Sequence, residues 1–111
     1  MIIPQQKDIV EVNFKLPGGK FEPHPALVIS NNTVNEYEDT FLAVMITSST
    51  EYDEYSILID NKMLSKPMRN KSQIRCHLMQ SFNFEEINLK IASFKKDYFD
   101  KILKKILKLN Y

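Results

Sequence analysis

The spacing of the apolar residues changes near residue 84, and this change limits the possible folds more than any other feature of the chain. Before it, apolar side chains either alternate with polar ones, as in 9–14, or form nearly continuous runs, as in 26–30 and 41–47. Alternation is typical of a half-buried strand, and a short continuous run is typical of a strand covered on both faces. From residue 95 onward, apolar side chains recur at helical spacing, with lysines opposite them. The sequence therefore predicts a set of strands followed by one amphipathic helix.

The expected strands are 9–14, 26–30, 41–47, 55–60 and, as the last clear strand, 73–78. The polar and acidic segment 31–39 is expected to be a surface loop. A short helical turn is expected after Asn83, which can act as its N-cap. Both glycines fall in 16–20 and predict a sharp turn there. Five or six short strands with a terminal helix predict an α+β, mainly β architecture, a small barrel or curled sheet in one domain over 1–111.

The net charge and the cysteine content exclude several classes of protein. The 111 residues carry a formal net charge of +1 at pH 7, whereas sequence-independent nucleic-acid binding usually needs a strongly basic surface. Any contact with RNA must then come from a local group of cations. One cysteine cannot form an intramolecular disulfide and suits a reducing compartment. No segment has the length of a membrane span or the composition of a signal peptide, so we expect a cytoplasmic protein that does not enter a membrane.

His24 is the first candidate for chemistry. It stands between two prolines at the entrance to the apolar run 26–30, and the prolines predict a tight turn that limits backbone movement. Imidazole is the side chain that exchanges a proton near neutral pH without strong tuning. The alternative is a surface histidine in a proline-rich loop, and the residues alone leave both interpretations open.

Hydroxyl groups follow the next apolar run. Thr47 and Ser48 end this run, and Ser49 and Thr50 continue the series. Hydroxyls at a strand end can donate to a phosphate without adding net charge. They can equally cap the strand by bonding to the local backbone.

The predicted strand 73–78 carries a cation and a second histidine. Because side chains alternate along a strand, Gln73, Arg75 and His77 share one face. That face is too polar for the core, so it lines a cleft or an interface, or is exposed to water. Cys76 points to the apolar face and is expected to be a core residue.

The sequence contains no motif typical of a metal site. The two histidines are 53 positions apart, with no accompanying carboxylate motif. A phosphate-binding glycine loop and a nucleophile elbow are also missing from the sequence. We therefore expect no metal and no other cofactor. An imidazole, hydroxyls and a guanidinium at three strand ends suit the handling of a phosphodiester.

The order and spacing of these segments resemble the MazF/PemK family of small toxins, also called the Kid or plasmid-maintenance toxins. The matching segments, in chain order, are 7–14, 17–20, 24–30, 44–48 and 72–75. Residues 24–30, His-Pro-Ala-Leu-Val-Ile-Ser, are similar to the family's Arg-Pro-Ala-x-Val-x-Ser strand. Residues 44–48 are similar to the strand that ends in Thr followed by Ser or Thr, and 72–75 to the Gln-Ile/Val-Arg segment.

The resemblance implies an SH3-like curled barrel that forms a homodimer. Proteins of this family cut single-stranded RNA without a metal, leaving a 2′,3′-cyclic phosphate and a 5′-hydroxyl, and a small antitoxin protein blocks them. In the family, an arginine before the Pro-Ala strand and the threonine after the third strand carry the reaction. Thr47 occupies the second position, whereas His24 stands in place of the arginine. Ser72 stands where some members carry an aspartate.

From the resemblance we expect His24 and Thr47 to be catalytic. The residues expected to contact the RNA are Lys20, Glu22, Ser48, Gln73, Arg75 and His77. In one hypothesis, His24 takes the 2′-hydroxyl proton or protonates the departing 5′-oxygen, and Thr47 donates to a non-bridging oxygen. Arg75 and His77, if they face the same cleft, supply positive charge and the second proton-transfer group. In the other, the missing arginine marks a divergent member that binds a protein or a nucleic acid without cutting it.

A plain RNA-binding barrel is a further alternative. Small barrels bind single strands through exposed aromatic side chains beside a basic groove. Here Tyr37, Tyr52 and Tyr55 stand among acidic residues in the sequence, which argues against a surface on which RNA bases stack.

Overall fold

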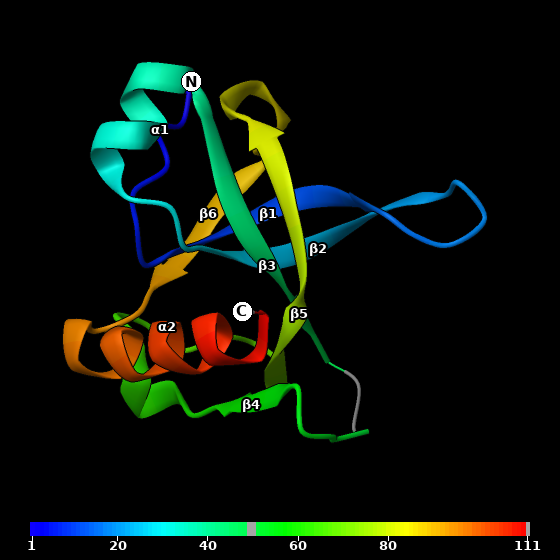
Figure 1. Cartoon of the computed structure of the whole chain (residues 1–111), viewed down its shortest axis with the longest axis vertical. Coiled ribbons are helices and arrows are strands. Elements are labelled where there is room, and N and C mark those ends of the chain that lie inside the picture. The colour runs from blue at the N-terminus through cyan, green and yellow to red at the C-terminus, as the bar shows by residue number, and fades with distance from the viewer. Residues whose placement is uncertain (49–50, 111) are drawn as a thin grey trace.

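A computed structural model describes residues 1–48 and 51–110 and confirms the mainly β fold with a C-terminal helix. Within these residues, six strands form one antiparallel sheet in the order β4-β5-β3-β2-β1-β6 (Figure 1). The strands are β1 (Asp8–Lys15), β2 (Phe21–Val28), β3 (Thr40–Thr47), β4 (Ser56–Ile59), β5 (Ser72–Asn83) and β6 (Leu89–Ser93). The helices are α1 (Asn32–Glu38) and α2 (Lys96–Asn110), with 3₁₀ turns η1 (Asn61–Met63) and η2 (Phe84–Glu86).

The sheet is curled so strongly that its two edges approach each other. The chain leaving η1 forms an isolated bridge from Leu64 to Phe94, directly after β6. The Ser65 N–H donates to the Ser93 carbonyl at 2.8 Å, which strengthens the same contact. The curl is therefore nearly closed by the segment after β4 rather than by β4 itself.

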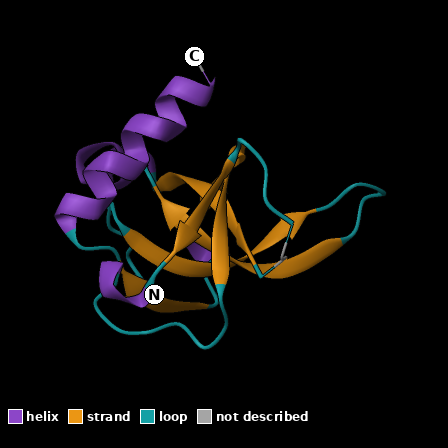
Figure 2. Ribbon diagram, turned by 90° about the horizontal axis from the view of Figure 1, so that it is seen from below, coloured by secondary structure: helices purple, strands orange, loops and turns teal. Residues whose placement is uncertain are grey.

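Helix α2 covers one face of the curled sheet. Its residues Phe99, Ile102 and Ile106 are at most 5% exposed and pack into a core cluster with side chains of the sheet. Burial of each such side chain stabilises the fold by about 1.5–3 kcal/mol. This confirms the helical spacing seen in the sequence, although Leu107 on the expected apolar face is 46% exposed. Figure 2 shows the helix lying along one side of the strands.

A second core cluster lies on the other face, between β1, β2, β3 and the end of β5. Its centre is aromatic: the ring centroids of Phe14 and Phe82 are 5.1 Å apart, and those of Phe41 and Phe82 are 5.6 Å apart. Beyond this cluster the β1–β2 hairpin extends away from the body of the molecule, as both Figure 1 and Figure 2 show. Gly18 and Gly19 form its turn with φ of +89° and +85°, conformations that favour glycine.

The expectation of a surface loop over 31–39 is wrong, because this segment contains helix α1. The side-chain oxygen of Asn31 accepts the Val34 N–H at 2.9 Å and caps the start of the helix. Asp39 adopts φ of 54° and ends it. Asn35 is fully buried and donates to the Ser30 carbonyl, so the helix is fixed to the sheet by a polar contact rather than by an apolar stripe.

The strand pattern near the C-terminus also differs from the prediction. β5 runs to Asn83, beyond the predicted end at 78, and β6 was not predicted at all. β6 is an edge strand in which only Ala92 is buried, so its sequence has no alternation to detect. The predicted helical turn after Asn83 is confirmed as η2. In the described part of the chain, no helix has the length and apolar character needed to cross a membrane.

Candidate functional site

The site begins at a break in the pairing between β3 and β5. Val44 pairs with Met79, but Ile46 pairs with Ile74, so four residues of β5 lie opposite Met45 alone. Over this stretch β5 turns toward β4, and the Cys76 N–H donates to the Tyr55 carbonyl at 2.8 Å. Such bulges bend a strand and leave backbone unpaired, which is why they are common beside functional sites.

A cavity of about 290 Å³ lies at this break, and we name it the Thr47 cavity. It is lined by Met45, Thr47, Glu51, Asp53, Arg75 and Leu78. Two of the predicted site residues, Thr47 and Arg75, therefore come together, from β3 and β5.

The guanidinium of Arg75 is held by two side chains. Its Nη1 donates to the Ser56 hydroxyl at 2.8 Å, and its Nη2 donates to Oδ2 of Asp53 at 3.0 Å. The Ser56 hydroxyl in turn donates to Oδ1 of Asp53 at 3.1 Å, and the same oxygen accepts the Tyr55 N–H at 2.9 Å. The network fixes the direction in which Arg75 points.

The charges in the Thr47 cavity do not favour an anion. The hydrogen bond from Arg75 lowers the pKa of Asp53, so this carboxyl group is ionised at neutral pH. Glu51 adds a second carboxylate to the lining, against the single positive charge of Arg75. A guanidinium has five N–H donors, and three of those on Arg75 have no partner among the described residues. The cavity therefore offers directed donors, but no net positive charge.

His24 lies inside β2, paired with Val12 of β1, and not in the predicted tight turn. The strand tolerates Pro23 and Pro25 because β2 pairs with β3 only from Ala26 onward, which leaves one edge open beside the prolines. The side chain of His24 is 22% exposed, and its Nε2 lies 3.8 Å from a carboxylate oxygen of Glu22. Its ring also meets the edge of Phe14, with centroids 6.4 Å apart.

The register of β2 and β3 relates His24 to Thr47. The ladder between these strands pairs Ala26 with Met45 and ends there. Continued by two residues in the same register, it sets His24 opposite Thr47. Because side chains alternate along a strand, both then share the sheet face of Ala26 and Met45. The pairing itself stops at Ala26, and His24 does not line the Thr47 cavity.

Gln73 differs from the expectation of a polar strand face. It is fully buried, and its Nε2 donates to the Glu51 carbonyl at 2.6 Å. Gln73 also pairs with Thr47 in the β3–β5 ladder. Its amide therefore connects the backbone of Glu51 to the strand that carries Arg75.

The other predicted contact residues lie outside the Thr47 cavity. His77 is exposed, and its ring centroid is 4.8 Å from that of Tyr55. Lys20 is exposed beside the hairpin turn, and Ser48 is exposed directly after β3. Ser49 and Thr50, which continue the predicted run of hydroxyls, lie outside the described residues.

Sequence reasoning did not identify Glu51, Asp53 and Ser56 as parts of the site. One local signal was available for the last two. An aspartate shortly before a strand often accepts backbone and hydroxyl hydrogens two and three residues later, as Asp53 does from Tyr55 and Ser56. The sequence did not indicate that Arg75 would join them.

Among the described residues, the geometry supports neither a cysteine nucleophile nor a metal site. Burial raises the pKa of the Cys76 thiol, so it is protonated at neutral pH and lies in the core as predicted. In the described ranges, 1–48 and 51–110, no group of three His, Cys, Asp or Glu side chains is placed to hold a metal ion.

Comparison with known proteins identifies the relatives of this chain. Residues 5–109 match the family described as PemK-like, MazF-like toxin of type II toxin–antitoxin system. No curated protein sequence matches the chain.

Several solved structures share the fold. MazF from Deinococcus radiodurans superposes with a TM-score of 0.79 at 16% identity, covering 98% of this chain and 97% of that one. An endoribonuclease from Mycobacterial species has a TM-score of 0.76 at 15% identity, covering 97% and 91%. An endoribonuclease in complex with its cognate antitoxin, also from Mycobacterial species, has a TM-score of 0.74 at 17% identity, covering 97% and 98%.

Proposed function

The chain belongs to the family of PemK-like, MazF-like toxins of type II toxin–antitoxin systems, and from this premise we propose that it is an endoribonuclease that cuts single-stranded RNA without a metal. The observation that carries the proposal is the Thr47 cavity, where a hydroxyl and a fixed guanidinium meet at the break between β3 and β5. Solved structures of the same fold that are described as endoribonucleases support it.

The proposed reaction is an internal transfer at one phosphodiester. The ribose 2′-oxygen forms a bond to phosphorus, and the bond from phosphorus to the 5′-oxygen of the next nucleotide breaks. A base takes the proton from the 2′-hydroxyl, and an acid gives a proton to the departing 5′-oxygen. The products are a 2′,3′-cyclic phosphate and a 5′-hydroxyl, and no oxidant or other reactant is consumed.

His24 is the proposed proton-transfer group. The support is its position in β2, two residues before the last residue paired with β3, on the same strand face as Ala26. Imidazole exchanges protons near neutral pH. The family carries an arginine at this position. A permanently charged guanidinium is therefore replaced here by a group that can give or take a proton.

Thr47 and Arg75 are proposed to stabilise the transition state. As the 2′-oxygen attacks, negative charge grows on the two non-bridging oxygens, and donors fixed in advance toward them lower the barrier. The proposed donors are the Thr47 hydroxyl and the three N–H groups of Arg75 that have no partner among the described residues. Asp53 and Ser56 do not touch the RNA in this proposal but position Arg75, which therefore needs no reorganisation during the reaction.

We also propose that the protein forms a homodimer and is inhibited by a small antitoxin protein. The support is the family itself and the related structure of an endoribonuclease in complex with its cognate antitoxin.

The test is incubation of the purified protein with a long, weakly structured RNA in the presence of EDTA, followed by mapping of both new ends. Discrete cuts with a cyclic phosphate and a 5′-hydroxyl are expected. The Thr47→Ala protein should cut more slowly by about 10²–10³-fold, the usual loss on removing one donor to a developing oxyanion. Intact RNA at micromolar protein would contradict the proposal and favour a member of the family that binds without cutting.

A further inference from the structure

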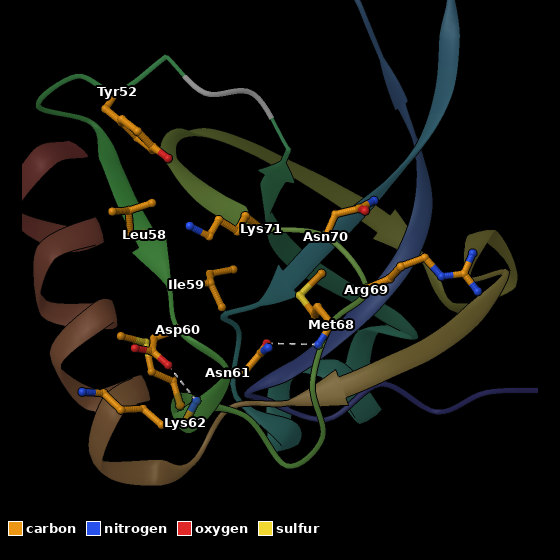
Figure 3. Close-up of a pocket in the computed structure, with 11 residues that line it drawn as sticks. Tyr52, Leu58, Ile59, Asp60, Asn61, Lys62, Met68, Arg69, Asn70 and Lys71 are labelled. Carbon is orange, nitrogen blue, oxygen red and sulfur yellow. Dashed lines mark hydrogen bonds between the residues drawn. The ribbon is translucent and has the colours of Figure 1, made fainter.

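A second cavity, of about 630 Å³, lies beside the Thr47 cavity and has no role in the proposed chemistry. The segment 51–53 separates the two. Glu51 and Asp53 line the Thr47 cavity, whereas Tyr52 between them lines the second one. We name it the Tyr52 cavity; its remaining walls come from β4, η1 and the loop that leads into β5 (Figure 3).

The charge of the Tyr52 cavity is opposite to that of its neighbour. Lys62, Arg69 and Lys71 line it, against the single carboxylate of Asp60. None of the three cations forms an ion pair within 1–48 and 51–110. Figure 3 shows the ammonium of Lys71 directed toward the side where Tyr52 and Leu58 lie, and the guanidinium of Arg69 directed away. Lys71 is therefore the cation that a bound molecule would meet.

The wall beside Lys71 is aromatic and apolar. Tyr52 and Leu58 are each 55% exposed and line the same cavity. In the sequence Tyr52 stands among acids, which argued against base stacking. In the structure two of those acids, Glu51 and Asp53, line the Thr47 cavity instead, and Asp53 is bound to Arg75. Tyr52 thus lines the same cavity as Lys71, which forms no ion pair among the described residues, and Asp60 is the one carboxylate in the described lining.

An exposed ring beside an unpaired ammonium suits a nucleotide. A base stacks on an aromatic face in a manner that tolerates any sequence, and its phosphate is attracted to lysine. The Thr47 cavity lacks the net positive charge to hold a polyanion, so affinity must come from elsewhere on the surface. We propose that the Tyr52 cavity is a subsite for a nucleotide flanking the cut in single-stranded RNA. This inference rests on the proposed function.

The test is binding of a fluorescent single-stranded RNA on the order of ten nucleotides long, with 2′-O-methyl groups throughout so that it cannot be cut. Tyr52→Leu should weaken binding roughly tenfold, whereas Tyr52→Phe, which keeps the ring, should bind like the parent. Lys71→Gln should weaken binding several-fold and reduce the slope of log affinity against log salt by about 1.

An exposed tyrosine and an exposed lysine elsewhere on the surface provide matched controls. Tyr37 on α1 is 85% exposed, and Lys104 on α2 is exposed; neither lines either cavity. Tyr37→Leu and Lys104→Gln should leave affinity and salt dependence unchanged. If these variants lose as much RNA affinity as Tyr52→Leu and Lys71→Gln do, any exposed tyrosine or lysine contributes equally. That result would overturn the subsite.

The cleavage assay separates failure of the subsite from failure of the proposed function. If the parent cuts RNA through Thr47 but Tyr52→Leu and Lys71→Gln bind RNA like the parent, the subsite is wrong and the nuclease stands. If the parent neither cuts nor binds RNA, both proposals fall. If a mixture of the four nucleoside 5′-monophosphates competes as strongly as RNA, the cavity takes free nucleotides and the RNA subsite is wrong.

Discussion

The Thr47 cavity and the Tyr52 cavity lie on either side of the same three residues, yet they are built in opposite ways. In the described lining of the first, the single cation, Arg75, is bound by Asp53 and Ser56, and carboxylates outnumber it. In the second, cations outnumber the carboxylate and form no ion pair among the described residues, beside an exposed ring. A fixed donor suits a transition state, and an unpaired cation suits a flexible polyanion.

Residues for the chemical step and residues for RNA affinity can thus lie on opposite sides of one short segment. Side chains alternate at 51–53, so a single residue, Tyr52, faces the opposite cavity from its neighbours. The account therefore predicts two groups of variants. Changes around the Thr47 cavity should alter the rate of cutting, and changes around the Tyr52 cavity should alter the affinity for RNA.

The largest effect is expected for His24→Ala. Loss of a proton-transfer group usually slows a reaction by about 10²–10⁴-fold, and here the loss should appear in the single-turnover rate at saturating protein. His24→Arg restores the family residue and should flatten the dependence of the rate on pH near neutrality, since the guanidinium stays charged. Cutting by His24→Ala at the parent rate would remove the imidazole from the mechanism.

Arg75→Ala is expected to have the next largest effect on the rate of cutting. Removing a fixed donor to the developing charge should slow cutting by about 10²–10³-fold. Arg75→Lys should not restore the rate, because one ammonium cannot reach Ser56, Asp53 and the phosphate in the geometry of a planar guanidinium. Thermal unfolding serves as the control: at neutral pH the loss of the ion pair with Asp53 should lower the Tm about as much as Asp53→Asn does, without unfolding the protein. A lysine variant as fast as the parent would show that only charge matters at this position.

Asp53→Asn should have an intermediate effect, about tenfold on the rate, because it acts through Arg75. The ion pair between Asp53 and Arg75 also predicts that the stability of the fold depends on pH. Because Arg75 lowers the pKa of folded Asp53, its stabilising contribution is present above the ordinary pKa and is lost as pH falls through the lowered value. The difference in Tm between the parent and Asp53→Asn should stay constant from about pH 8 to about pH 4 and shrink below it. A difference that does not change on acidification would argue against this ion pair.

The smallest effect is expected for Glu51→Gln. Removing one carboxylate from the Thr47 cavity should strengthen RNA binding by roughly two- to fivefold, the scale of an exposed charge interaction. The gain should disappear at high salt, where such interactions are screened. Weaker binding, measured by anisotropy with the uncleavable RNA, would mean that Glu51 contacts the substrate directly and that the cavity's charge is not what limits affinity.

Periodicity predicted much of the fold and little of the site. The helical spacing after residue 95 gave α2, and the two apolar runs gave the central strands, because burial of whole faces leaves a repeating pattern. Helix α1 has no apolar stripe, since its buried residue is Asn35, and β6 buries only Ala92. Neither leaves a pattern to detect.

The network around Arg75 was beyond sequence reasoning for a different reason. Its partners Ser56 and Asp53 are 19 and 22 positions away, and they meet Arg75 only because β5 breaks its pairing with β3 and turns toward β4. A strand break of this kind depends on tertiary packing, not on a local pattern. The prolines around His24 predicted a turn where the structure has a strand. The open edge of β2 accommodates them there.

Single-turnover cleavage of one RNA at increasing protein concentration, for Arg75→Ala and Lys71→Gln beside the parent, decides whether the two cavities have separate roles. Each curve gives a rate at saturation and a half-saturating concentration. The account predicts that Arg75→Ala lowers the saturated rate with little change in half-saturation, and that Lys71→Gln does the reverse. If both variants change the same parameter, the two cavities do not divide chemistry from affinity, and the account is contradicted.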